Sequence, residues 1–344
     1  MGKIITLGEI MLRLKSPNHE RFFQNPLLEA TFGGGEANVA VSLSLFGKET
    51  YFLSSVPENP IGEAAIQELR KYGVNTSFVN KEKNARLGIY FLESGSNARP
   101  SVVVYDRENS AISNAEPTDF PWDKIFEKGS WFHITGITPA ISKKAQELSL
   151  EAVKQAKKMG ATLSIDLNYR KKLWNYGKNP SEVMKELVKY ADVLIANEED
   201  IQKALEIHPS VDIVKGQLDI EDYKKLIISV KDEFPNLSKI AITLRESFSA
   251  DNNAWSGILY DKDNFFISQK YQIEDIVDRV GGGDAFAAGL IFGLDEYQYD
   301  SQKALDFAVA ASALKHTISG DFNLVRKDEV LSLMEGNVSG RVQR

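Results

Sequence analysis

The sequence predicts an α/β fold: a doubly wound, mostly parallel β-sheet flanked by helices, with a small β-sheet lid. Three observations support this prediction. Runs rich in β-branched and aromatic residues alternate with helix-length segments, which is typical of β–α–β units with helices on both faces of a parallel sheet. The alternation breaks at about residues 12–32 and 87–110. No stretch reaches the ~18 uninterrupted apolar residues that a membrane helix needs.

The expected elements follow one another along the whole chain. In order, the strands cover residues 3–10, 50–56, 131–137, 162–168, 192–197 and 239–244. The helix-length segments include residues 36–47, 61–73, 142–160, 180–191 and 284–294. Strands that are separated by a helix pair in parallel, so these segments predict the main sheet and its two covering layers.

The two breaks in the alternation predict the lid. Residues 87–106 contain two strand-like runs joined by a polar loop with glycine, asparagine and proline, which predicts a hairpin. Residues 12–32 are irregular and follow the first strand. Together they are expected to form a small sheet on a single domain that covers residues 1–340. A second hairpin is expected over residues 255–270.

Composition excludes several kinds of site. The 344 residues include no cysteine, which rules out disulfides, thiolate metal ligands and a cysteine nucleophile and favours the cytoplasm. The four histidines are far apart in the sequence, without the spacing of a paired metal site. With a net charge of −7 and no basic stripe interleaved with aromatics, neither a nucleic-acid partner nor a membrane is expected.

Polar residues follow the expected strands, where an open parallel sheet binds its ligands. They are Glu9 and Arg13, residues 33–38, Asp166, Asn168 and Arg170, residues 197–200, Thr243 and Arg245, and residues 278–284. This set is rich in glycine, carboxylate, amide and arginine. The mixture suits phosphate groups, a metal ion and a polar substrate.

The stretch DRVGGGDAFAAG, residues 278–289, predicts an anion site. Gly281, Gly282 and Gly283 precede a helix whose first N–H groups are unpaired, and Asp284 follows them. The stretch fits neither the dinucleotide fingerprint nor the P-loop. The alternative is that Asp284 is only an N-cap. Capping needs no run of glycines, so the pattern favours phosphoryl binding.

A second glycine cluster, GGGEAN, precedes an apolar helix. Gly33 and Gly34 there allow a substrate to approach main-chain N–H groups, although a tight turn explains them equally well. Asn38 lies within the apolar helix and favours a site, because a buried amide needs partners.

Three further groups are candidates. Asp166, Asn168 and Arg170 alternate along an extended run and share a face; the alternative is a salt bridge among them. Arg170, at the strand exit, suits a carboxylate or phosphate. In the segment NEED, Glu199 and Asp200 suit a hydrated Mg²⁺, although a charged first helical turn explains them as well.

The hairpin carries the last group. Tyr105 and Arg107 are two residues apart and face the same side of one arm, and Tyr90 on the other arm is placed to face them. The alternative is a solvated aromatic and arginine surface, which is common on small sheets.

These motifs resemble those of the ribokinase-like (PfkB) carbohydrate kinases over essentially the full length, most closely the 2-keto-3-deoxygluconate kinases. The family signature DTxGAGDxFxxG is matched by DRVGGGDAFAAG, and its diglycine with a helical asparagine is matched by Gly33, Gly34 and Asn38. The run VPENPIG departs from the family's VGxDxxG at Pro57 and Glu58.

The resemblance implies a role for each residue of the glycine loop. Asp284 is the base that takes the proton from the substrate hydroxyl, and Gly281, Gly282 and Gly283 form the anion hole, with ATP and Mg²⁺ as cofactors. Arg279 stands where the family has threonine. This difference leaves open whether a K⁺ ion lies beside the loop, as in some relatives.

The resemblance also implies the binding residues. The substrate residues are Gly33, Gly34, Asn38, Tyr90, Tyr105, Arg107, Arg170 and Asp284. The ATP-binding residues are Asn197, Thr243, Arg245, Gly281, Gly283 and Asn323, and Glu199 and Asp200 hold the metal through water. Two arginines favour an anionic sugar, because a buried carboxylate must be paired.

The expected function is therefore ATP-dependent phosphorylation of 2-keto-3-deoxygluconate to its 6-phosphate. A kinase of a neutral ketose such as fructose and a non-catalytic sugar-acid sensor are the alternatives. The gluconate and galactonate epimers are not distinguished by the sequence. A homodimer through the lid is expected, because exposed strand edges and the apolar run VVV favour pairing.

Overall fold

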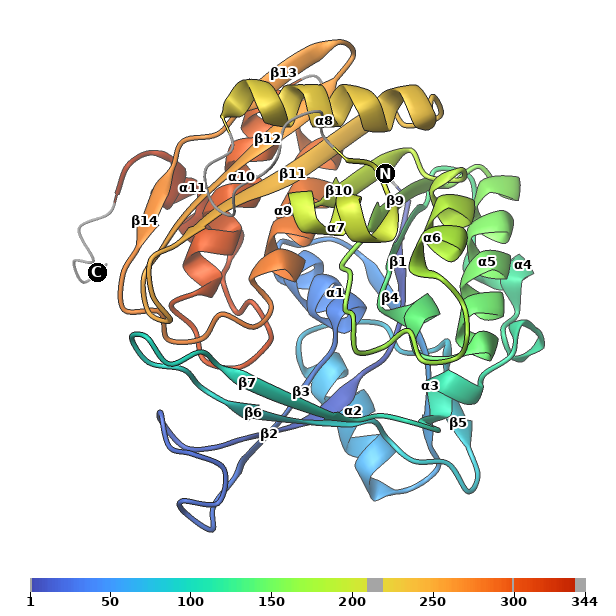
Figure 1. The fold of residues 1–344 in the computed structure, drawn as a ribbon. Coiled ribbons are helices and arrows are strands. Elements are labelled where there is room, and N and C mark those ends of the chain that lie inside the picture. Colours follow the sequence, from blue (N-terminus) through green and yellow to red (C-terminus); the bar gives the residue numbers. More distant parts are fainter. Residues whose placement is uncertain (1, 209–218, 299, 338–344) are drawn as a thin grey trace.

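A mixed sheet between two helix layers forms the body of the protein (Figure 1). The computed structural model describes residues 2–208, 219–298 and 300–337. The expected domain end at residue 340 lies outside the described residues. Among the described helices, none has the length and apolar character needed to cross a membrane.

The main sheet is parallel over most of its width, as predicted. Its strand order is β13-β12-β11-β10-β9-β8-β1-β4-β5, with β14 also paired to β12. The strands are β1 (Ile4–Leu7), β4 (Thr50–Pro57), β5 (Val79–Glu82), β8 (Trp131–Thr135), β9 (Thr162–Asp166), β10 (Val193–Ala196), β11 (Lys239–Ser247), β12 (Asn253–Asp261), β13 (Asn264–Ile267) and β14 (Tyr271–Ile273). Every neighbouring pair from β5 to β11 is parallel, and β12 pairs antiparallel with β11, β13 and β14.

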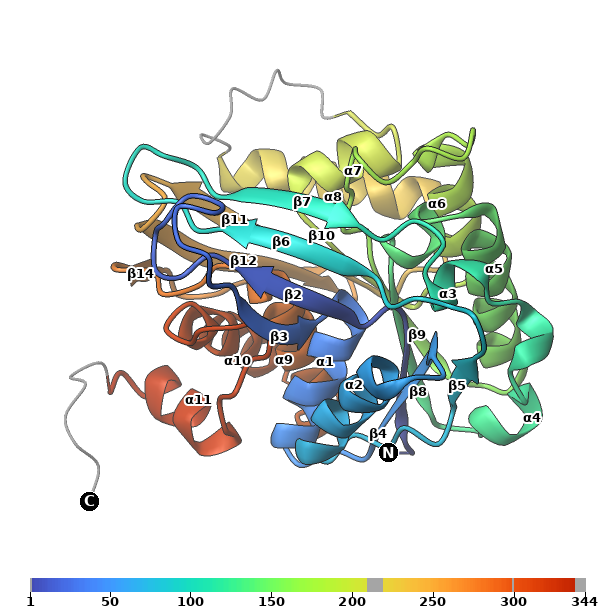
Figure 2. The ribbon, with the colours of Figure 1, turned by 90° about the horizontal axis from the view of Figure 1, so that it is seen from below.

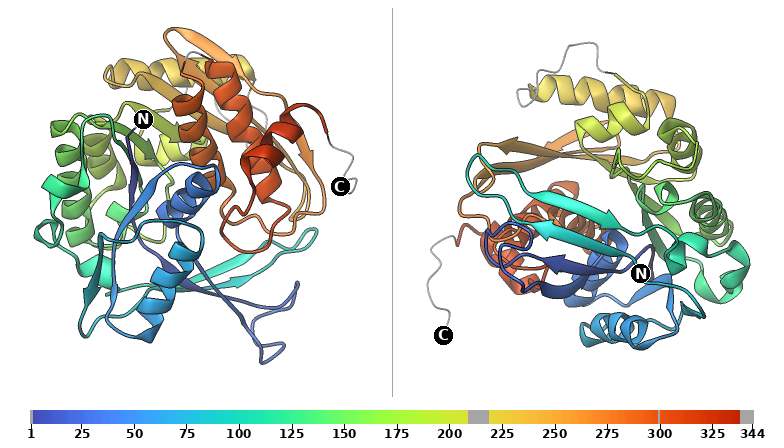
Figure 3. Two further views of the ribbon diagram at one scale, coloured as in Figure 1. Left: turned by 180° about the vertical axis from the view of Figure 1, so that it is seen from behind. Right: turned by 60° about the horizontal axis from the view of Figure 1, so that its bottom comes forward.

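Helices cover both faces of this sheet, which Figures 1 and 3 show from opposite sides. One layer contains α1 (Gly35–Leu45), α2 (Pro60–Lys71), α9 (Gly282–Glu296) and α10 (Ser301–Lys315), with α11 (Lys327–Met334) beside α10. The other contains α5 (Lys143–Lys158), α6 (Pro180–Val188), α7 (Glu198–Ala204) and α8 (Ile220–Glu233). Short helical turns α3 (Ala111–Asn114), α4 (Trp122–Ile125), Pro117–Asp119 and Thr138–Ala140 complete it.

Strand β1 shows why the core has two halves. Ile5 and Leu7 pack in the cluster that contains the apolar faces of α5, α6 and α8, whereas Ile4 packs with α9 and α10. Side chains alternate across a strand, so a central strand buried on both faces is apolar at successive positions. Helices α9 and α10 pack closely. Gly289 and Gly293 of α9 make this possible, because a Cβ at either position would collide with the backbone of α10.

A separate four-stranded sheet lies along one side of the body (Figure 2). Its order is β3-β2-β6-β7, with β2 (Met11–Lys15), β3 (Glu29–Gly33), β6 (Ile89–Glu93) and β7 (Val102–Asp106). The antiparallel pairing of β6 with β7 confirms the first predicted hairpin, and that of β12 with β13 confirms the second. The small sheet is therefore built from the two segments in which the alternation breaks.

The predicted first strand is wrong at its end. It was expected to run to residue 10, but β1 ends at Leu7 and the chain crosses to the small sheet, where β2 begins at Met11. Gly8 marks the exit, because a Cβ there would lie 2.0 Å from the carboxylate of Glu36. The apparent single strand is therefore two strands that belong to different sheets.

Candidate active site

A cleft of about 840 Å³ opens between the small sheet, the loops after the parallel strands and the start of α9. Most of the predicted site residues line it: Gly34, Asn38, Tyr90, Tyr105, Arg107, Arg170, Asn197, Glu199, Asp200, Thr243, Arg245, Gly281, Gly282, Gly283 and Asp284. Gly33 and Asn323 do not line it. The topology therefore brings together residues from both ends of the chain.

The glycine loop forms the first turn of α9. Gly281 is the N-cap and has φ +85°, in the left-handed region that favours glycine. A Cβ there would lie 2.2 Å from the backbone oxygen of Asp321. Gly281 has no side chain to cap the helix. The N–H of Gly282 donates weakly to the carbonyl of Arg279, at 3.4 Å, and the N–H of Gly283 is left for a ligand.

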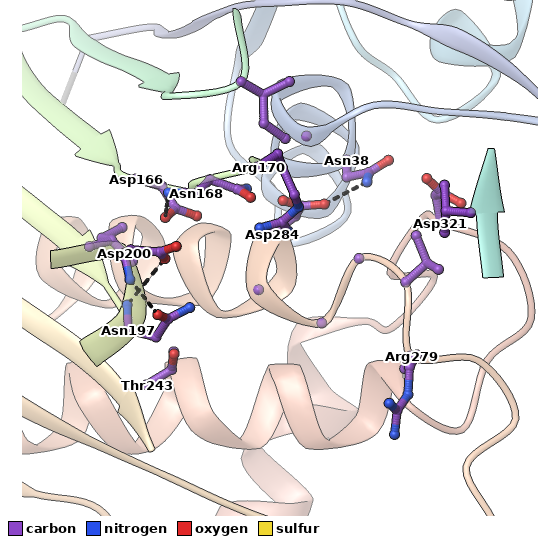
Figure 4. Close-up of a pocket in the computed structure, with 18 of the residues that line it drawn as sticks. Asn38, Asp166, Asn168, Arg170, Asn197, Asp200, Thr243, Arg279, Asp284 and Asp321 are labelled. Atoms are coloured by element: carbon purple, nitrogen blue, oxygen red, sulfur yellow. Dashed lines mark hydrogen bonds between the residues drawn. The ribbon is translucent and has the colours of Figure 1, made fainter. Parts of the chain in front are cut away.

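Asp284 lies in this turn and faces the cleft, but it is not the N-cap, so the capping alternative is wrong. The residue is only 8% exposed, and its Oδ2 accepts a hydrogen bond of 2.6 Å from Nδ2 of Asn38 (Figure 4). Oδ1 of Asn38 in turn accepts from the N–H of Gly34, at 3.2 Å. The buried amide thus joins the diglycine to the carboxylate.

Burial raises the pKa of Asp284 to about 7, and the negative charges of Asp321 and Glu36 add to the increase. The hydrogen bond from Asn38 and the charge of Arg170 act in the opposite direction. A carboxyl group with this pKa both gives up and takes back a proton near neutral pH, as a general base requires.

Gly33 and Gly34 allow neighbouring groups to approach the backbone closely. A Cβ on Gly34 would lie 1.9 Å from the backbone oxygen of Glu9, and one on Gly33 would lie 2.1 Å from the carboxylate of Asp321. Gly33 therefore makes room for Asp321 instead of facing the cleft. Asn323 is buried, and neither polar atom of its amide has a hydrogen-bond partner within the described part of the chain.

Three polar residues, Asp166, Asn168 and Arg170, lie at the end of β9 and just after it, beside the cleft. Asp166 accepts a hydrogen bond of 3.2 Å from the N–H of Asn168, and Nη1 of Arg170 donates to the carbonyl of Tyr169. Burial raises the pKa of Asp166 well above its usual value, and the charges of Asp200 and Asp284 add to this. Arg170 is exposed, so its guanidinium is accessible to a ligand.

Asp200 belongs to a helix cap. It forms a capping box with Asn197 at the start of α7, and its Oδ1 accepts from the N–H of Tyr169 at 2.9 Å. The contacts of Asp200 are therefore those of the alternative interpretation, in which it belongs to a charged first turn of a helix. Burial raises its pKa to about 6. In residues 2–208, 219–298 and 300–337, no group of three His, Asp or Glu side chains is close enough to hold a metal ion.

Arg107 is buried and ion-paired, so the alternative of a solvated surface is wrong for it. Its Nε donates to Oε2 of Glu9 at 2.7 Å, and Arg107 and Glu9 are 6% and 3% exposed. Oε1 of Glu9 is a buried cleft atom without a hydrogen-bond partner in the described structure. The guanidinium charge that was predicted for the substrate is thus compensated by a neighbour.

Positive charge gathers on the other side of the glycine loop. Arg279 lies away from the carboxylates of Asp166 and Asp200 in Figure 4, and its Nη2 donates to the carbonyl of Ala250 at 3.0 Å. Burial lowers the pKa of Arg279, and the charge of Arg245 lowers it further. Nε1 of Trp255 is buried in the cleft and lacks a partner within the described chain. This region is suited to the phosphates of a nucleotide.

An ion network that the sequence did not predict lies at the wall of the cleft, where Tyr90 and Asp321 line it. Arg13 of β2 is 1% exposed, its Nη1 donates to Asp321 at 2.6 Å, and its Nη2 pairs with Asp278. The hydroxyl group of Tyr90 also donates to Asp321. Arg13 and Asp278 were among the residues at strand ends and in the glycine motif, but no pattern pointed to Asp321. The network ties the small sheet to the loops around α9.

Glu36 lies in the predicted range 33–38, but its buried contacts were not predicted. Its Oε1 accepts from the N–H and hydroxyl of Thr135 and from the hydroxyl of Thr138, at 2.8–3.0 Å. Burial raises its pKa. The carboxylate fixes the start of α1 against the end of β8, and so fixes the helix that carries Asn38.

The chain is similar to sugar kinases along its length. The sequence profile of the pfkB family carbohydrate kinases matches residues 1–326. A 2-dehydro-3-deoxygalactonokinase of Haloferax volcanii is 32% identical over 339 residues, which cover 98% of each chain. The crystal structure of a 2-dehydro-3-deoxygluconokinase from Thermotoga maritima is 46% identical, with a TM-score of 0.90, and covers 97% of this chain and 99% of that one.

A further structure carries a nucleotide. It is an uncharacterized sugar kinase from Pyrococcus horikoshii in complex with ATP, 25% identical to this chain, with a TM-score of 0.75. The match covers 96% of this chain and 97% of that one. The likeness thus spans both the small sheet and the main body.

Replacing Asp284 with asparagine is expected to stabilise the protein at alkaline pH. Its folded pKa of about 7 exceeds the ordinary value of 3.8, so the group contributes full stability below the lower value and loses it as pH rises through the higher one. Asparagine does not titrate. Urea unfolding at pH 8 should give the variant a free energy of unfolding roughly 2–4 kcal/mol above wild type.

The difference should shrink steadily as the pH is lowered toward 4. Asp123→Asn, at an exposed position of α4, is the matched control and should change little at any pH. An Asp284→Asn variant no more stable than wild type at pH 8 would show that the carboxyl group is not perturbed as described.

Proposed function

Because the chain belongs to the pfkB family of carbohydrate kinases, we propose that it transfers the terminal phosphoryl group of ATP to the terminal hydroxyl of 2-keto-3-deoxygluconate, giving the 6-phosphate. The observation that carries the proposal is the buried carboxyl group of Asp284 in the first turn of α9, at a helix end that no side chain caps. The names of two extensive relatives, both keto-deoxy sugar acid kinases, support the choice of substrate.

Asp284 is the general base in this proposal. With a pKa of about 7 it is largely ionised just above neutral pH, yet basic enough to accept the proton of the attacking hydroxyl. The hydrogen bond from Asn38 fixes the orientation of the carboxylate. The other carboxylate oxygen is left for the substrate hydroxyl.

The glycine loop stabilises the transferred group. The backbone N–H of Gly283, at the positive end of a fifteen-residue helix, suits an oxygen of a phosphoryl group. The N–H of Gly282 makes a long bond of 3.4 Å to the carbonyl of Arg279, which a phosphoryl oxygen would replace. Arg245 and Arg279 add positive charge on the nucleotide side of the cleft. Such positioning and charge stabilisation account for most of the catalysis of phosphoryl transfer.

Mg²⁺ fits the cleft as a hydrated ion that arrives with ATP. Bound there, it neutralises the phosphate charges. Both oxygens of Asp200 already accept hydrogen bonds from backbone N–H groups and are not free to coordinate the ion directly. Glu199 and Asp200 would therefore hold the ion through its water ligands. Burial raises the pKa values of Asp166 and Asp200, and neighbouring carboxylates add to the increase, so a cation nearby would favour their ionised forms.

Arg170 is the proposed partner of the sugar carboxylate. It is exposed at the cleft, whereas the charge of Arg107 is compensated by Glu9. Arg107 then acts through its orientation beside Tyr105, with its guanidinium 5.5 Å from the ring centre. The compensation of Arg107 also favours the second candidate, a kinase of a neutral ketose such as fructose.

Coupled ADP release with Mg·ATP tests the proposal. We expect turnover of 2-keto-3-deoxygluconate or its galactonate epimer to exceed that of fructose and ribose. In Asp284→Asn, kcat should fall about 10²–10⁴-fold with a small change in KM, because a general base acts on the transition state. Turnover of neutral sugars alone would contradict the acidic substrate and favour a kinase of a neutral ketose. No turnover of any sugar would favour a non-catalytic sugar-acid sensor.

Substituting Arg170 separates acidic from neutral substrates. Arg170→Met should lower kcat/KM for the keto-deoxy acid about 10–100-fold, the cost of a hydrogen bond to a charged group, chiefly through KM. Turnover of fructose should not fall in parallel. Lys172→Met, at an exposed position two residues further on, is the matched control. Equal losses on both sugars would argue against a carboxylate contact.

The small sheet is also proposed as a dimer contact. Strand β7 lies at its edge, with Val102 and Val104 38% and 48% exposed, and such an edge favours pairing with a second copy. Sedimentation at micromolar concentration should show a dimer that Val104→Asp converts to a monomer. A monomeric wild-type protein would contradict this contact.

A further inference from the structure

Lys315, the last residue of α10, is fully buried and lies behind the glycine loop. Its Nζ donates to the carbonyl of Ile318 at 3.0 Å and to the carbonyl of Asp278 at 3.4 Å. Asp278 begins the glycine motif, and Ile318 belongs to the turn that leads to Asp321. One ammonium group therefore holds the two chain segments between which the start of α9 is placed.

The side chain lies directly against the loop. A Cβ on Gly281 would lie 3.3 Å from Cε of Lys315 and 2.2 Å from the backbone oxygen of Asp321. Gly281 and Asp321 line the cleft, whereas Lys315 does not. The lysine thus contacts the loop from the side opposite the ligand.

Three neighbouring carboxylates favour the charged form of Lys315. Burial lowers the pKa of Lys315, and the carboxylates of Asp278, Asp321 and Asp284 act in the opposite direction. Arg13 is the other cation that faces it and already pairs with Asp278 and Asp321. Three carboxylates therefore act on Lys315, and Arg13 and Lys315 together supply two positive charges against their three.

Lys315 has a structural role, because it supplies donors to the carbonyls of Asp278 and Ile318. A buried lysine is nevertheless costly to desolvate, and an uncharged donor would meet that structural need at a lower cost. The charge instead lies one residue layer from the N–H groups where negative charge gathers during phosphoryl transfer.

We propose that Lys315 is a built-in cation of the site, a positioning residue that fixes the loop from Asp278 to Gly283 and offsets the charge of the bound phosphates. The inference rests on the proposed function. It predicts that the enzyme requires no added monovalent cation, because the chain supplies one.

Kinetics of Lys315 variants test the inference. In Lys315→Met and Lys315→Ala, kcat should fall at least tenfold, while KM for the sugar changes less than threefold. Ammonium chloride or ethylamine should restore part of the kcat of Lys315→Ala but not that of Lys315→Met, in which the space is filled. Lys303→Met, at an exposed position of the same helix, should match wild type.

Several results would overturn the inference. They are a kcat of Lys315→Met within twofold of wild type, a loss in Lys315→Ala that no amine reduces, and a wild-type enzyme that needs K⁺ for turnover. The last comparison, in potassium, sodium and tetramethylammonium salts, uses wild type alone and remains decisive if the variants do not fold. Full wild-type activity in all three salts is the expected result.

The inference and the proposed function fail differently. If wild type phosphorylates the sugar but the variants are normal, only the role of Lys315 is wrong. If wild type turns over no sugar, the proposed function fails, and calorimetry with a non-hydrolysable ATP analogue takes the place of kinetics. Weaker analogue binding by Lys315→Ala that ammonium restores would support the built-in cation, and unchanged binding would overturn it.

Discussion

The burial of one carboxyl group, that of Asp284, is the constraint on which the site depends. A carboxylate at the start of α9 is favoured by the helix dipole but opposed by desolvation and by neighbouring negative charges. The balance sets its pKa near 7, and the hydrogen bond from Asn38 sets its direction. The helix that carries it is fixed by close packing against α10, and α1 is fixed by Glu36.

The second requirement is that the small sheet and the glycine loop keep their relative positions. The ion network of Arg13 with Asp278 and Asp321 meets it, because it joins β2 to both segments that flank the loop. Removing one member of such a buried network leaves an uncompensated charge, which is far more costly than losing a surface pair. The same network places Tyr90 at the cleft.

The parts of the molecule that the sequence predicted are those encoded by local pattern. Alternating segments predicted the parallel sheet, the breaks predicted the small sheet, and the glycine run before α9 predicted a helix terminus open to ligands. Pairings between distant residues had no local pattern. The partner of Arg13 is 308 positions away in Asp321, and Lys315 looks like an ordinary cation in the last turn of a helix. The pairing of Arg107 with Glu9 likewise depends on the crossing between sheets.

Carbon-13 NMR of protein labelled at the aspartate carboxyl carbons tests the central claim most directly. The account predicts a signal that titrates near pH 7 and is absent from the Asp284→Asn variant, separate from the signals of Asp166 and Asp200. If the signal lost in that variant titrates near the ordinary pKa of 3.8, burial does not raise the pKa of Asp284, and the account of the site is wrong.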